Sequence, residues 1–145
     1  MIMELTQKEK LARERVCIAL DTENVDQAIE WTKKLSQYAG SFKIGKSLHA
    51  IAGTERRDIL SEVAQVGGLS FLDLKVYDTP DQVRRFAMAV TSPEVYMFNL
   101  HIGSEKMTKS AVKSSYKKSE KLKIKKPYVI GVTELTSLDD EDLKK

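Results

Sequence analysis

The chain has little of several residues that mark particular protein classes. Its 145 residues include one cysteine, Cys17, with 3 prolines and 7 glycines. A single cysteine excludes an internal disulfide and a cysteine-based metal cluster. The chain also has only two histidines, His49 and His101, so no metal site is expected. The low proline and glycine content excludes a collagen-like or low-complexity chain.

Long apolar segments are also absent. No apolar run approaches the roughly 18 residues of a membrane span, and the charged start, MIMELTQKEKLARER, lacks the apolar centre of a signal peptide. We therefore expect a soluble, cytoplasmic protein with no membrane partner.

The composition that remains is that of an ordinary globular domain. Hydrophobic residues make up 41% and charged residues 31% of the chain, and the length suits one domain over residues 1–145. The net charge of +3 comes from 24 basic and 21 acidic residues. This balance predicts no nucleic-acid partner for the protein as a whole.

The basic residues are concentrated in one segment. Residues 106–126 hold nine lysines and a single acid, Glu120. They could form a polyanion-binding face. A solvated helix face is favoured, because Met107, Ala111 and Val112 offer an apolar stripe near helical spacing and charge blocks usually solvate.

Apolar periodicity predicts alternating strands and helices. We expect strands at 16–20, 41–45, 69–74, 95–101 and 128–132, and helices at 6–15, 26–38, 56–65, 80–90, the lysine-rich segment and 139–145. Strand–helix units repeated about every 25–30 residues indicate a parallel α/β sheet. The absence of a glycine-rich dinucleotide fingerprint and of a P-loop disfavours a doubly wound sheet. We predict a TIM (β/α)8 barrel of which this chain holds the first five βα units or so.

Polar residues recur where the predicted strands end. They are Asp21, Asp73 with Lys75, His101 and Thr136. In a barrel the carboxyl ends of the strands converge on one site, so these residues are candidates for the active site.

The segment FLDLKVYDTP, residues 71–80, is the most informative. Asp73 and Lys75 lie two apart on a strand and should point the same way, with Asp78 following after a turn. Such an array keeps a lysine protonated for use as a general acid. It also repels a substrate carboxylate and stabilises the carbanion that its loss creates. A structural ion pair at the sheet rim is the alternative interpretation.

Five blocks together resemble the orotidine 5′-phosphate decarboxylase family. They are ALD at 19–21, FKIG at 42–45, FLDLKVYDTP at 71–80, MFNLH at 97–101 and GVTELTS at 131–137. The Asp-x-Lys-x-x-Asp pattern also occurs in a wider group of phosphosugar decarboxylases and synthases. Lys43 and the Leu-Thr-Ser sequence narrow the resemblance to the orotidylate branch.

The resemblance implies a carbon–carbon lyase that converts orotidine 5′-monophosphate to uridine 5′-monophosphate in pyrimidine synthesis. It implies a homodimer with shared active sites and no cofactor. Lys75 would protonate C6, Asp73 would crowd the departing carboxylate, and Lys43 would join their charge network. Asp78 would reach into the neighbouring subunit's site.

The same resemblance implies substrate-binding residues. Asp21 and Lys43 would contact the ribose, and Thr136 or Ser137 the pyrimidine. Residues 79–82, TPDQ, depart from the family's Ile-Pro-Asn-Thr, so Gln82 would take over a threonine's hydrogen bond. Tyr77 replaces a common histidine. The family's phosphate-gripping residues would follow residue 145, so we expect weak or no activity from residues 1–145 alone.

Two other functions are open from the sequence. One is a sugar-phosphate decarboxylase of the wider group. The other is a catalytically incomplete barrel fragment that acts as a binding or assembly partner through the lysine-rich helix. Among the remaining residues, Cys17 and Trp31 are expected in the core, and His101 is expected to orient a loop through a hydrogen bond.

Overall fold

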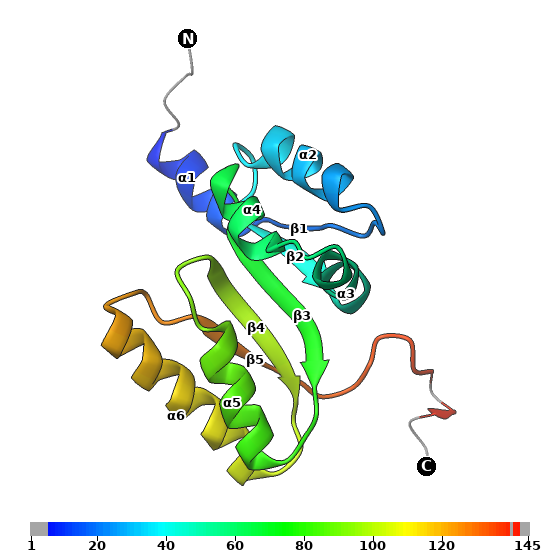
Figure 1. Ribbon diagram of the computed structural model, residues 1–145, viewed down its shortest axis with the longest axis vertical. Coiled ribbons are helices and arrows are strands. Elements are labelled where there is room, and N and C mark those ends of the chain that lie inside the picture. The colour runs from blue at the N-terminus through cyan, green and yellow to red at the C-terminus, as the bar shows by residue number, and fades with distance from the viewer. Residues whose placement is uncertain (1–5, 140, 143–145) are drawn as a thin grey trace.

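The computed structural model describes residues 6–139, 141 and 142, in which helices and strands alternate (Figure 1). The helices are α1 (Gln7–Glu14), α2 (Val25–Leu35), α3 (Lys46–Thr54), α4 (Ile59–Gln65), α5 (Pro80–Val90) and α6 (Glu105–Leu122). The strands are β1 (Cys17–Ala19), β2 (Ser41–Gly45), β3 (Ser70–Val76), β4 (Val95–His101) and β5 (Tyr128–Val132). Within these residues no helix is both long and apolar enough to cross a bilayer.

The strands form one sheet whose order follows the chain. The order is β1-β2-β3-β4-β5, and every neighbouring pair is parallel. A doubly wound sheet reverses its strand order at a switch point, whereas a barrel winds in sequence. The topology is therefore that of a partial (β/α) barrel, as predicted.

Most elements lie where apolar periodicity placed them. The bounds of β2, β4, β5 and α5 match their predicted ranges, and α6 covers most of the lysine-rich segment. The prediction had no separate element for α3, which follows β2 directly. The helix expected at 139–145 falls largely on residues outside those described.

Local sequence accounts for the element ends. Thr6 and Glu9 form a capping box at the start of α1. Thr79 caps α5, with Pro80 in the first turn, where its missing N–H costs nothing. Between α4 and β3, Gly67 adopts φ 90°, and a Cβ on Gly68 would lie within 2.9 Å of Thr32, Val63 and Phe42. Glycine is therefore required where this connection packs against the core.

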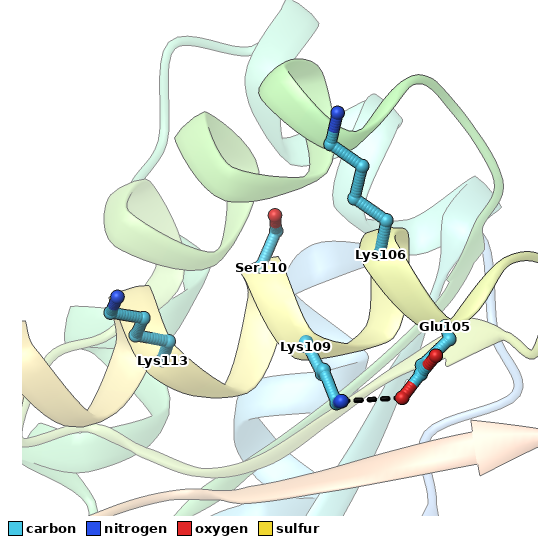
Figure 2. A pocket seen from close by; sticks show the side chains of 5 residues that line it. All are labelled: Glu105, Lys106, Lys109, Ser110 and Lys113. Carbon is cyan, nitrogen blue, oxygen red and sulfur yellow. Dashed lines mark ion pairs between the residues drawn. The ribbon is translucent and has the colours of Figure 1, made fainter.

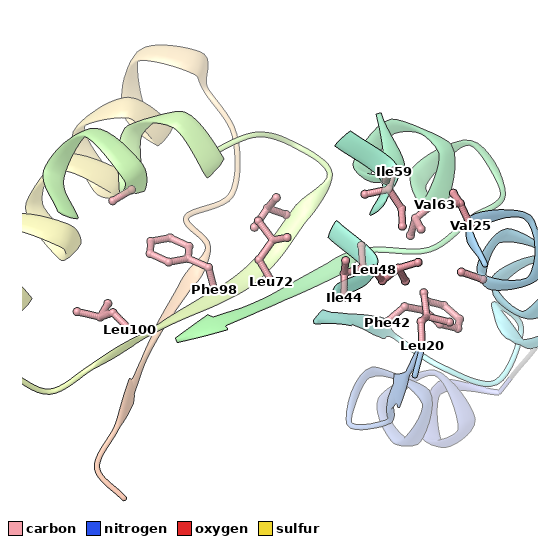
Figure 3. Packing of buried hydrophobic residues seen from close by; sticks show 14 of the residues in the cluster. Leu20, Val25, Phe42, Ile44, Leu48, Ile59, Val63, Leu72, Phe98 and Leu100 are labelled. Carbon is pink, nitrogen blue, oxygen red and sulfur yellow. The ribbon is translucent and has the colours of Figure 1, made fainter. Parts of the chain in front are cut away.

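The core lies between the strands and their helices. Phe42, Ile44, Leu72, Phe98 and Leu100 are fully buried strand residues in one cluster with apolar helix residues. Figure 3 shows the β2 side chains beside Leu48, Ile59 and Val63, whereas those of β3 and β4 lie toward the other helices. Because side chains alternate along a strand, Lys43, Asp73 and Asn99 belong to the opposite face.

The prediction of a buried first strand was wrong in part. Of β1, only Ile18 packs against the core, and Cys17 and Ala19 are exposed. The reason is that β1 is an edge strand of this sheet, and these two side chains point to the face opposite Ile18. Cys17 is therefore not a core thiol, whereas Trp31 is partly buried against the core as expected.

Helix α6 buries one side and exposes its lysines. Met107, Ala111, Ser114, Ser115 and Ser119 are buried, and Val112 of the expected stripe is only half-buried. Exposed lysines, which we call the lysine face, occupy the other side; they are Lys106, Lys109, Lys113, Lys117 and Lys121. Figure 2 shows the first three around a shallow surface hollow of about 420 Å³. This is the solvated helix face that the sequence favoured.

Candidate active site

Charged and polar side chains from three neighbouring strands meet near the carboxyl ends of those strands. Lys43 of β2, Asp73 and Lys75 of β3, and Asn99 of β4 lie together, and Asp21 joins them two residues beyond β1. We call these five residues the site cluster. Sequential parallel strands bring them together because their carboxyl ends share one edge of the sheet.

Asp73 is the centre of the site cluster. One of its oxygens, Oδ1, lies 2.6 Å from Lys75 Nζ, and the other, Oδ2, lies 3.6 Å from Lys43 Nζ. Lys43 Nζ in turn lies 3.1 Å from Asp21 Oδ1. The result is a chain of alternating charges, Asp21–Lys43–Asp73–Lys75. The predicted pairing of Asp73 with Lys75 is therefore present.

The environment keeps Asp73 ionised. Its side chain is only 11% exposed, and burial is the largest influence on its pKa and acts to raise it. Hydrogen bonds from Lys75 and Asn99, with the charges of Lys75 and Lys43, outweigh burial and lower the pKa below its ordinary value. The carboxylate is thus a fixed negative charge at neutral pH.

The backbone at Lys75 departs from regular strand geometry. Lys75 has φ 47°, in the left-handed region that non-glycine residues seldom adopt. The β3–β4 pairing also shifts register between Leu72 and Val76. Backbone of this kind persists only where its surroundings hold it, and it is often found at functional sites.

Asn99 was not predicted as a site residue from the sequence. Its side-chain Nδ2 donates to Asp73 Oδ1 at 2.6 Å, and its Oδ1 accepts from the Lys75 backbone N–H at 2.7 Å. The available signal was a single amide inside the otherwise apolar centre of β4, VYMFNLH. A buried amide needs hydrogen-bond partners. The pairing of β4 with β3 places Asn99 beside the carboxyl end of β3, where those partners lie.

Other predicted site residues lie outside the site cluster. Asp78 accepts a hydrogen bond from the Thr79 N–H at 2.6 Å and takes part in no ion pair among the described residues. Gln82 lies in the first turn of α5 and donates its backbone N–H to Thr79. Thr136 and Ser137 are exposed in the segment after β5.

His101 ends β4 on the same side of the sheet. Its ring meets the ring of Tyr77 edge-on, with centroids 6.5 Å apart. Within the part of the chain that the structure describes, its side chain makes no hydrogen bond, so the expected loop-orienting bond is not found. The same described residues contain no group of three or more His, Cys, Asp or Glu side chains placed to hold a metal ion.

A hollow beside Asp21 offers space for a ligand. It has a volume of about 310 Å³ and is lined by residues 20–23 and 45–48. It therefore adjoins the Asp21–Lys43 end of the site cluster. Chemically, the cluster can hold an ammonium group at a fixed position next to a carboxylate, which suits delivery of a proton to a carbanion.

Comparison with known proteins gives one consistent family. The profile of the orotidine 5′-phosphate decarboxylase / HUMPS family matches residues 14–145. The orotidine 5′-phosphate decarboxylase of Syntrophomonas wolfei is 35% identical over 134 residues, 92% of this chain and 55% of that protein. That of Syntrophus aciditrophicus is 34% identical over 99% of this chain and 57% of its own length.

Solved structures agree with the sequence comparison. Orotidine 5′-phosphate decarboxylase from Lactobacillus acidophilus superposes with a TM-score of 0.77 at 30% identity, over 90% of this chain and 58% of that one. The corresponding enzyme of Methanocaldococcus jannaschii gives a TM-score of 0.64 at 26% identity, over 86% and 56%. The chain thus spans a little over half the length of these relatives.

Proposed function

Because the chain belongs to the orotidine 5′-phosphate decarboxylase / HUMPS family, we propose that its site cluster decarboxylates orotidine 5′-monophosphate. The product is uridine 5′-monophosphate, and the reaction is the last step of pyrimidine synthesis. The observation that carries this proposal is the ionised Asp73 held 2.6 Å from the Lys75 ammonium.

The proposed chemistry needs only fixed charge and one proton donor. The bond between C6 and the carboxylate breaks, CO₂ leaves, and the electron pair stays on C6. Lys75 Nζ then gives a proton to C6 and regains one from water. Asp73 repels the substrate carboxylate and attracts the ammonium, so the charge arrangement favours the transition state over the bound substrate.

Substrate binding is assigned to the residues around this pair. Lys43 and Asp21 contact the ribose, a role supported by their ion pair and by the hollow beside Asp21. Thr136 or Ser137 bonds the pyrimidine, and Gln82 donates a further hydrogen bond. Their exposure leaves these polar groups available to a ligand.

A homodimer is part of the proposal. Asp78 is exposed on the loop that leads from β3 to α5, and no ion pair of the described residues involves it. It is therefore available to approach the site cluster of a second copy, where it would add a carboxylate beside Lys75.

The direct test is release of CO₂ from orotidine 5′-monophosphate labelled at its carboxyl carbon. Lys75→Ala should lower the rate about 10²–10⁴-fold, the range for loss of a general acid. Lys113→Ala, which removes a solvated lysine of α6, is the matched control and should leave the rate unchanged. Equal rates for wild type and Lys75→Ala would refute the assigned role of Lys75.

A further inference from the structure

Asn99 is the most deeply buried member of the site cluster. As a whole residue it is 3% exposed, whereas Asp73, Lys43 and Lys75 are half-buried and Asp21 is exposed. The proposed reaction gives this amide no role. Its burial next to two charged groups therefore requires an explanation.

Both ends of the Asn99 amide are bonded to β3. Asn99 Nδ2 donates a hydrogen bond to Asp73 Oδ1, the same oxygen that accepts a hydrogen bond from the Lys75 ammonium. Asn99 Oδ1 accepts a hydrogen bond from the backbone N–H of Lys75. One side chain thus holds the carboxylate of the ion pair and the backbone that carries its lysine.

The pairing of the strands leaves room for this arrangement. Leu72 pairs with Phe98, and the next partners are Val76 and Leu100. Between these pairs, β3 has the three residues 73–75, whereas β4 has Asn99 alone. The amide therefore occupies the place of the missing ladder bonds and supports the left-handed φ of Lys75.

Asparagine satisfies both contacts where similar residues do not. Aspartate would face the Asp73 carboxylate with an oxygen, replacing a hydrogen bond by repulsion between like charges. Glutamine is one methylene longer in a fully packed site, and alanine would leave the Lys75 N–H and one carboxylate contact without partners.

We propose that Asn99 is a positioning residue that holds the Lys75 backbone in its left-handed conformation and fixes the Asp73 oxygen bonded to the Lys75 ammonium. This inference rests on the proposed function for its catalytic consequence. The structural part is independent of it, because the two hydrogen bonds can be measured without turnover.

The first test compares Asn99→Ala with Thr91→Val by NMR. Thr91 is equally buried but bonds Ser115 between α5 and α6, away from the site cluster. In Asn99→Ala the Lys75 amide should exchange about tenfold faster. The titration midpoint of the Asp73 carboxyl should rise, because its charged form loses a hydrogen bond. Neither value should change in Thr91→Val.

Asn99→Asp changes the contact with Asp73 but can keep the contact with the Lys75 N–H. It replaces Asn99→Ala in the test if that variant does not fold. Its remaining oxygen can still accept from the Lys75 N–H, so amide protection should persist. The added like charge should raise the Asp73 midpoint. Unchanged Lys75 exchange and Asp73 titration in folded Asn99→Ala, or an unchanged Asp73 titration in Asn99→Asp, would overturn the proposal.

The second test measures turnover of orotidine 5′-monophosphate. Asn99→Ala should lower kcat about 10²-fold with little change in KM, because the proton donor is misplaced rather than removed. Thr91→Val should keep the wild-type kcat. Residues 1–145 alone are expected to have weak or no activity. If wild type shows no turnover, binding of a carbanion analogue tests the proposed function, and the NMR measurements decide the role of Asn99. Wild-type kcat in folded Asn99→Ala would overturn the positioning role.

Discussion

The site cluster and the lysine face of α6 are both rich in lysine but differ in how those lysines are held. In the site cluster, Lys43 and Lys75 each contact a carboxylate and are half-buried. On the lysine face, Lys109 pairs with Glu105. The other four make no ion pair with any of the described residues.

Helix geometry explains the second pattern. With 3.6 residues per turn, the five lysines of the lysine face fall within about 120° of the helix circumference. That arc is opposite the buried side chains, so each ammonium extends into water. A site requires opposed charges with fixed geometry, and a high density of one charge on a helix does not supply it.

The largest expected difference between the regions comes from removing one carboxylate. Asp73→Asn should lower decarboxylation about 10²–10³-fold, because a neutral amide neither opposes the substrate carboxylate nor anchors the two lysines. The control is Asp81→Asn, which removes an exposed carboxylate paired with Arg84 and Arg85 on α5. A similar loss in both variants would contradict the special role of the site cluster.

A smaller effect, on the unfolding free energy, should come from the buried side of α6. Thr91 and Ser115 share a buried hydrogen bond of 2.8 Å between α5 and α6. Thr91→Val should lower the unfolding free energy by about 1–3 kcal/mol, since it leaves the Ser115 hydroxyl without this partner. Urea denaturation measures it. The double variant Thr91→Val/Ser115→Ala should recover part of the loss, and no recovery would contradict this reason.

The stability that the site cluster contributes should depend on pH through Asp73. The pKa of Asp73 lies below its ordinary value of 3.8 in the folded protein. Its ionised form therefore stabilises the fold above pH 3.8, and that contribution disappears as the pH falls through the lowered pKa. The difference in unfolding free energy between wild type and Asp73→Asn should shrink on acidification. If the difference in unfolding free energy between the two proteins did not change with pH, the prediction would be contradicted.

The smallest effects belong to the lysine face. Lys113→Ala and Lys117→Ala should each change the unfolding free energy by less than about 0.5 kcal/mol, because both side chains are exposed and no described residue pairs with them. Thermal or urea unfolding at low salt checks this prediction. A loss above about 1 kcal/mol would mean that these lysines have partners that exposure does not reveal.

The sheet and much of the site cluster could be predicted from sequence because both depend on short patterns. Apolar runs set β2, β4 and β5, and the two-residue spacing of Asp73 and Lys75 placed both side chains on one side. Contacts between strands were harder to predict. Asn99 depends on the register of β4 against β3 and on the bulge at Lys75, which no local pattern specifies.

The errors at Cys17 and Val112 share a physical origin. An apolar run predicts a strand or a helix face, but its burial depends on what packs against it. Cys17 lies in an edge strand and faces away from the helices, and Val112 lies beside the buried stripe of α6 rather than within it. The sequence could not supply these neighbours.

The most direct test of the site cluster is calorimetric titration of the chain with 6-hydroxyuridine 5′-monophosphate, an analogue of the carbanion. We expect binding by wild type and by Lys113→Ala, and loss of that binding in Lys75→Ala. The absence of binding by folded wild type, or equal affinity in Lys75→Ala, would contradict it.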